Sequence, residues 1–113
     1  MNKSRIMWVE NKNGDGIVGS VRIGRVTFSK SGKSVYYQGK RLETLSGKGF
    51  KANYFEVSSG DYYWISGCRK DGKDALYNTD VEIDDDVRVE YWTKIRNKPE
   101  NVKANKFRAK GKY

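Results

Sequence analysis

The sequence contains no histidine, one cysteine and one proline. Without histidine the chain lacks the commonest general base and the commonest metal ligand, and Ser-His-Asp and Cys-His catalytic arrangements are excluded. The single cysteine, Cys68, cannot form an intrachain disulfide, and one cysteine without histidine cannot build a structural zinc site. We therefore expect a protein that is not an enzyme and that binds no metal and no cofactor.

Long apolar runs are also missing. No segment approaches the roughly 20 apolar residues that a membrane-spanning helix needs, and the first residues lack the apolar stretch of a secretory signal. We therefore expect a cytoplasmic protein with no membrane contact. Only 36% of the 113 residues are hydrophobic, but 13% are aromatic, and these large side chains can fill the modest core of a single domain.

Acidic residues are too few to balance the basic ones. The formal net charge is +9, and more than half of this excess falls in residues 98–113, where six basic residues accompany one acidic residue. This segment has no apolar periodicity, so we expect a disordered basic tail (98–113) after one β-rich domain (1–97). A positive field of this kind favours an acidic partner, most commonly DNA or RNA.

Residues 21–43 carry the clearest structural pattern. Glycine in Ser31-Gly32 and in Gln38-Gly39 accepts the positive φ of a two-residue hairpin turn. Because side chains alternate along a strand and opposed pairs share a face, the two turns divide the strands into two sets. The set that we predict as core is Val26, Phe28, Val35, Tyr37 and Leu42, and the polar, cationic set is Arg25, Thr27, Tyr36, Gln38 and Arg41.

Residues 50–57 and 61–67 predict a further hairpin across Ser59-Gly60. This register makes one face, predicted as core, from Phe55, Val57, Tyr62 and Trp64. The opposite face carries Tyr54, Tyr63 and Ile65. We interpret it as a face covered by another element or as a protein-contact surface.

A late helix is predicted at about 84–96. Asp84 to Asp86 suit the N-cap and first turn of a helix, and Val87, Tyr91 and Ile95 make an apolar stripe. A strand is the alternative, since apolar and polar residues also alternate from Val89 onward. Together these patterns predict a mainly β fold: a small antiparallel meander closed into an SH3-like barrel or left as a half-open roll, with one short C-terminal helix.

Five segments resemble a family of small uncharacterised bacterial proteins: residues 6–10, 24–39, 50–57, 63–77 and 83–96. The resemblance covers roughly residues 5–97. Some members carry a label borrowed from 1-deoxyxylulose-5-phosphate synthase, an enzyme that is several times longer and binds thiamine diphosphate with a metal. The family has no established activity, so the resemblance implies little chemistry. Similar sequences usually have SGPKK-DG where this chain has Cys68, which argues against an essential cysteine.

The sharpest functional hint is a combination of cations and aromatic rings. Lysine and arginine neutralise phosphates, and a ring can stack on a base, so we predict a non-catalytic domain that binds nucleic acid. The predicted nucleic-acid-binding residues are Arg25, Tyr36, Arg41, Arg69, Lys70, Lys73, Lys106 and Arg108. The alternative is a protein-interaction or structural module, such as an accessory subunit or a toxin-neutralising protein, with Tyr54, Tyr63 and Ile65 as its contact residues.

Overall fold

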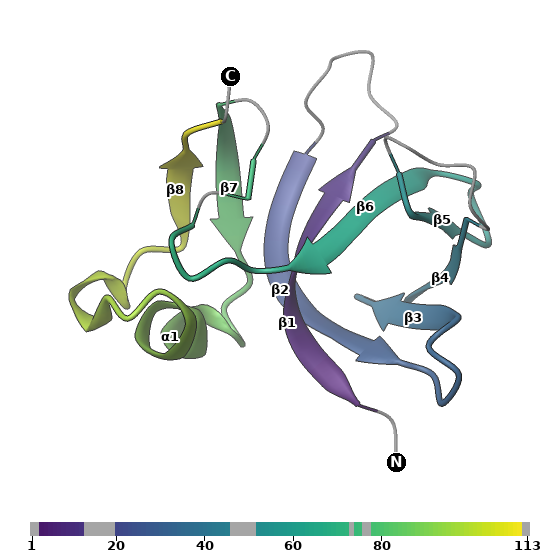
Figure 1. Ribbon diagram of the computed structural model, residues 1–113, viewed down its shortest axis with the longest axis horizontal. Helices are drawn as coiled ribbons and strands as arrows, with labels where there is room; N and C mark the ends of the chain where they lie inside the picture. Colours follow the sequence, from purple (N-terminus) through teal and green to yellow (C-terminus); the bar gives the residue numbers. More distant parts are fainter. Residues whose placement is uncertain (1–2, 13–19, 46–51, 73, 76–77, 112–113) are drawn as a thin grey trace.

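The computed structural model describes residues 3–12, 20–45, 52–72, 74–75 and 78–111 (Figure 1). Within them, one sheet runs in the order β1-β6-β5-β4-β3-β2-β7-β8. Its strands are β1 (Ser4–Asn11), β2 (Ser20–Phe28), β3 (Ser34–Tyr37), β4 (Lys40–Thr44), β5 (Tyr54–Glu56), β6 (Tyr62–Gly67), β7 (Thr79–Ile83) and β8 (Lys106–Ala109). Helix α1 (Arg88–Glu90) continues into the π-helical turn η1 (Tyr91–Ile95), and the 3₁₀ turn η2 (Pro99–Asn101) follows.

Strands β1 to β6 close into an antiparallel barrel, because β1 pairs with β2 along one edge and with β6 along the other. Strand β2 is shared. It pairs with β3 near its end, while its first residues pair in parallel with β7, which extends the sheet beyond the barrel. The mainly β fold, with a small barrel and one short late helix, is therefore confirmed.

The predicted registers of the 21–43 meander are also confirmed. Phe28 lies opposite Val35, and Tyr36 lies opposite Arg41. Gln38 and Gly39 have φ of 50° and 76°, as a primed two-residue turn requires. The first connection is longer than predicted, since β2 ends at Phe28 and β3 begins at Ser34, but the longer loop leaves the pairing unchanged.

Two hydrophobic cores share the wall formed by β1 and β2. The barrel interior holds Met7, Val9, Val26, Val35, Tyr37, Leu42, Tyr63 and Ile65. The second core lies on the outside of β1 and β2, where Trp8 and Ile23 pack against β7, the helical segment and β8. Both faces of β1 are covered, which explains its unbroken buried run from Ile6 to Glu10.

The helix is confirmed, but it begins later than predicted. A turn precedes Arg88, and the N-cap residue is Val87, which makes no side-chain capping bond. The prediction that the aspartates cap the helix is therefore wrong, because Asp84 is held by side chains of the barrel instead. The apolar stripe is present: Val87 and Tyr91 are fully buried in the second core.

The predicted disordered tail is wrong for the residues up to 111. Strand β8 pairs antiparallel with β7, and Phe107 and Ala109 belong to the second core. The indole of Trp92 donates to the Ala104 carbonyl at 2.8 Å, and the Arg96 guanidinium lies 5.4 Å from the Phe107 ring centroid. The few apolar residues of this segment, such as Phe107 and Ala109, alternate with cations in the sequence. They are buried against a helix and a strand that come earlier in the chain, so the local pattern alone does not predict their burial.

The hairpin of β5 and β6 pairs Tyr54 with Tyr63 and Phe55 with Tyr62, two residues away from the predicted register. The loop is longer because the hydroxyls of Ser58 and Ser59 donate to the Glu56 carboxylate and order it. A two-residue shift keeps the same side chains together on each face.

The face of this hairpin that we predicted as core is nevertheless the wrong one. Val57 and Tyr62 are 49% and 51% exposed, whereas Tyr63 and Ile65 are buried inside the barrel and Tyr54 packs against them. The predicted protein-contact surface at Tyr54, Tyr63 and Ile65 is thus interior, and burial raises the pKa of both tyrosines.

Candidate functional site

Aromatic side chains gather on the outside of the barrel over strands β3 to β6. We call this surface the aromatic face and define it by Tyr36, Arg41, Phe55, Val57 and Tyr62. Tyr36 is opposite Arg41, the Val57 amide donates to the Arg41 carbonyl at 3.0 Å, and Phe55 is opposite Tyr62. Tyr36 and Tyr62 are 39% and 51% exposed and Phe55 is partly exposed, so rings from three strands lie on one side of the sheet together with Glu43, which is opposite Phe55.

Two of the predicted nucleic-acid-binding residues, Tyr36 and Arg41, lie side by side on this face, as their register requires. Arg25 lies earlier on β2, and its guanidinium binds Glu90 of α1 at 2.9 Å. The sequence argument missed Phe55, Val57 and Tyr62 because it placed them in the core. The sequence carried no signal for their exposure, because alternation separates the two faces of the hairpin without indicating which face is covered.

The other predicted cations lie elsewhere. Arg69 and Lys70 follow β6, Lys106 and Arg108 lie on β8, and Lys73 is outside the described residues. Figure 1 shows β8 and the strands β3 to β5 at opposite ends of the molecule. The predicted residues therefore do not form one surface.

Four of the predicted arginines are paired with carboxylates. Besides Arg25 with Glu90, the pairs are Arg41 with Glu43 at 3.0 Å, Arg69 with Asp71 at 3.1 Å and Arg108 with Asp80 at 3.1 Å. These pairs are exposed, and an exposed pair contributes only about 0–1 kcal/mol. Each arginine can therefore exchange its carboxylate for a phosphate or another anion at little cost.

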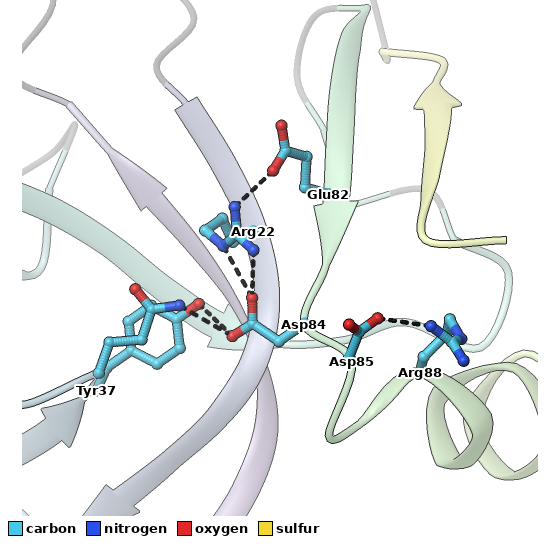
Figure 2. A network of polar contacts seen from close by, with 7 residues as sticks. Arg22, Tyr37, Glu82, Asp84, Asp85 and Arg88 are labelled. Carbon is cyan, nitrogen blue, oxygen red and sulfur yellow. Dashed lines mark hydrogen bonds and ion pairs between the residues drawn. The ribbon is translucent and has the colours of Figure 1, made fainter.

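A second cluster lies where β2 passes from the barrel to β7 (Figure 2). Arg22 donates from Nε to Asp84 Oδ1 at 2.8 Å and forms an ion pair with Glu82. Tyr37 reaches out of the barrel and donates to Asp84 Oδ2 at 2.6 Å. Asp84 thus links the barrel to the part of the sheet formed by β7 and β8, which we call the extension. Sequence reasoning missed this role because Arg22 and Tyr37 are remote from Asp84 in the chain.

The Arg22–Asp84–Tyr37 cluster borders a depression of about 390 Å³, which also receives Arg25 and Gln38. Hydrogen bonding to Asp84 raises the pKa of Arg22 above its usual range, and burial together with Asp84 raises the pKa of Tyr37. Arg22 therefore stays charged and Tyr37 stays neutral around pH 7. Neither exchanges protons there, and the cluster acts as a fastening between two parts of the fold.

Asp84, Asp85 and Asp86 all border the depression beside Arg22, but Asp84 and Asp85 have different partners. Asp84 faces the barrel, and Asp85 binds Arg88, as Figure 2 shows. Within the described residues, no group of three or more acidic or cysteine side chains is arranged to hold a metal ion. Among the helices that the structure describes, none is both long and apolar enough to cross a bilayer.

Cys68 lies at the end of β6, beside the second core. Burial, together with the nearby Asp74, raises the pKa of its thiol to about 12, although Arg5 and Arg96 act in the opposite direction. The neighbouring cations in the sequence therefore do not activate this thiol.

We expect Cys68 to react very slowly with a thiol reagent in the folded protein at pH 8. The thiolate is the reactive form, and a pKa of about 12 instead of 9.0 lowers its population by roughly a thousandfold. The measurement is the rate of reaction with a chromogenic disulfide, with the urea-unfolded chain as the control. Equal rates in the two states would show that the thiol is accessible and ionised as in a free peptide.

The same shift makes stability depend on pH. Because the folded thiol holds its proton more tightly than the unfolded one, its contribution is complete below pH 9 and is lost as pH rises toward 12. Tyr91, whose pKa burial raises to about 12, acts in the same direction. Urea unfolding should therefore show a fall in the free energy of unfolding above pH 9, and a flat profile up to pH 11 would contradict it.

Comparisons with protein-family models, with curated proteins and with solved structures found no match for this chain. The resemblance to small bacterial proteins therefore stays a prediction, and the geometry alone bears on function.

Proposed function

We propose that this protein is a non-catalytic binding domain that holds a nucleic-acid strand on the aromatic face of its barrel. The observation that carries this proposal is the exposure of Tyr36 and Tyr62 on the same surface as Arg41. Stacking of a base on an exposed aromatic ring contributes about 1–3 kcal/mol to binding.

The charges on and around this face are compatible with a polyanion. Arg41 binds Glu43 in an exposed pair, so a phosphate can replace the carboxylate with little loss. The net charge of +9 attracts nucleic acid at long range and speeds its association. Neighbouring β-strands are about 5 Å apart, so the rings on β3, β5 and β6 are separated by roughly 5–15 Å. A single nucleic-acid strand of several nucleotides can therefore reach all of them.

The proposal is tested by fluorescence anisotropy with a labelled single-stranded oligonucleotide, titrated at low and at physiological salt. We expect Tyr36→Ala and Tyr62→Ala each to weaken binding about 5- to 100-fold, as loss of one stacked base implies. Affinity should also fall as salt rises, because phosphate contacts release counterions. Val89→Ala is the matched control, since Val89 is 54% exposed but lies on α1, which contributes no residue to the aromatic face.

Two results would overturn the proposal. One is the absence of binding at low salt. The other is an equal loss of affinity in Val89→Ala and in the two tyrosine variants, which would show that the aromatic face is not the site.

A protein partner is the second candidate for this face. It is favoured by Val57, an aliphatic side chain that is 49% exposed among the rings, and by the pairing of Arg41 with Glu43, which lowers the local positive charge. If the chain ignores oligonucleotides, Val57→Asp becomes the informative variant. It should abolish capture of a stoichiometric protein partner while the control Val89→Asp retains it.

A further inference from the structure

We propose that the free edge of β8 binds an extended, acidic segment of a partner protein as an added antiparallel strand. Strand β8 is the last in the sheet order, and it pairs only with β7 among the described strands. Among its described strands the barrel has no comparable edge, because β1 joins β2 and β6 and closes it. This proposal is independent of the proposed function of the aromatic face.

The hydrogen-bond pattern shows which backbone groups face the free edge. The Ile83 amide donates to the Asn105 carbonyl at 2.8 Å, so these two residues form a hydrogen-bonded pair of the β7–β8 ladder. Hydrogen-bonded pairs alternate along an antiparallel ladder, so Phe107 and Ala109 also bond to β7. The amide and carbonyl groups of Lys106 and Arg108 therefore point away from β7, toward the open edge.

The side chains of the same two residues set the chemistry of the partner. Lys106 and Arg108 are exposed on one face of β8, and Phe107 and Ala109 face the second core. Across the ladder Arg108 binds Asp80, and Lys106 lies opposite Glu82, whose carboxylate forms an ion pair with Arg22. A strand added here would place alternate side chains beside these cations and the others beside the half-buried Phe107.

Charge complementarity therefore selects an occupant with alternating acidic and apolar residues. A second copy of this chain is disfavoured, because two β8 edges in antiparallel contact would bring Lys106 and Arg108 against the same cations of the other copy. Cations on an edge strand commonly prevent such self-pairing. Main-chain hydrogen bonds give affinity in this mode of recognition, and the alternate side chains give specificity.

The test uses amide hydrogen exchange, measured by NMR on the full chain, with two five-residue peptides as probes. One peptide alternates glutamate with valine, and the other alternates lysine with valine. In the free protein, the amides of Lys106 and Arg108 should exchange much faster than those of Phe107 and Ala109. The acidic peptide at millimolar concentration should slow exchange at Lys106 and Arg108 at least about tenfold, and the basic peptide should not.

Two variants separate the backbone from the charge. Arg108→Pro removes the outward N–H group and the cation but no bond to β7, and proline is tolerated on edge strands. We expect it to abolish protection of Lys106 by the acidic peptide. Arg108→Ala keeps the N–H group and should weaken the peptide only a few-fold. Retained protection of Phe107 and Ala109 in each variant verifies that β8 is still formed.

Several outcomes would overturn the proposal. Slow exchange at Lys106 and Arg108 in the free protein would show that the edge is already occupied. Equal protection by both peptides would remove the acidic specificity. Protection that rises with protein concentration alone would assign the edge to a second copy, and protection by an oligonucleotide would assign it to nucleic acid.

Discussion

Replacing Asp84 with alanine should destabilise the fold by about 2–3 kcal/mol, which is a large fraction of the stability of a domain of this size. The Asp84 side chain is 11% exposed and accepts hydrogen bonds from Arg22 and Tyr37. Its removal leaves the buried Tyr37 hydroxyl without its acceptor, which is costly, whereas Arg22 is 39% exposed and keeps its ion pair with Glu82. Asp84→Asn keeps one acceptor oxygen and should recover part of the loss.

The measurement is urea unfolding at pH 7, followed by tryptophan fluorescence and by circular dichroism. Asp86→Ala is the matched control, because Asp86 is an exposed aspartate two residues away in the same turn. It should change the free energy of unfolding by less than about 0.5 kcal/mol. If the two variants lose the same stability, Asp84 is an ordinary turn residue and does not fasten the barrel to the extension.

Replacing Gly24 with alanine should lower the free energy of unfolding by about 2–3 kcal/mol, because the added methyl group would enter the contact between Asp84 and Tyr37. Gly24 lies in the middle of β2, and a Cβ atom built there would collide with the Asp84 carboxylate and would lie 2.5 Å from Tyr37 Cε1. Neither neighbour can move freely, because each is held by a hydrogen bond to the other. Glycine is required here because the ring of Tyr37 crosses the strand backbone.

Gly67→Ala is the matched control for this substitution. Gly67 is also in a strand, β6, and a Cβ atom there would meet only the end of Arg5 at 3.5 Å, an ordinary contact. Its variant should be neutral within about 0.5 kcal/mol in the same unfolding experiment. Equal losses at Gly24 and Gly67 would attribute the effect to the general cost of changing a strand glycine.

The meander could be predicted from the sequence because the turn residues that set its register are adjacent in the chain to the strands that they pair. Gln38-Gly39 fixes the turn, and the turn fixes that Val35 faces Leu42 and that Tyr36 faces Arg41. Two of the five residues of the aromatic face, Tyr36 and Arg41, follow from this register. The helix was predictable for a similar reason, since the stripe that contains Val87 and Tyr91 lies within a few turns of chain.

The remaining features depend on parts of the chain that are distant in sequence. Trp64 looks like a barrel residue but packs on the second core, which exists only because β7 and β8 cover the outside of β1 and β2. A pattern of alternating residues states that two faces differ, but it does not state which face is covered. For the same reason Phe107 looked like part of a soluble tail, and Asp84 looked like a helix cap.

The shared wall of β1 and β2 constrains the order in which the molecule can fold. Trp8 and Ile23 are made early in synthesis, yet the elements that bury them, from β7 to β8, are separated from them by more than 50 residues. The barrel contains mainly pairings between neighbours along the chain, and only the pairing of β1 with β6 closes it over a long distance. A nascent chain can therefore complete the barrel while its outer apolar surface is still bare. Until the last strands arrive, this apolar surface is exposed, and its burial waits for the parallel pairing of β2 with β7, a non-local kind of pairing that generally forms slowly.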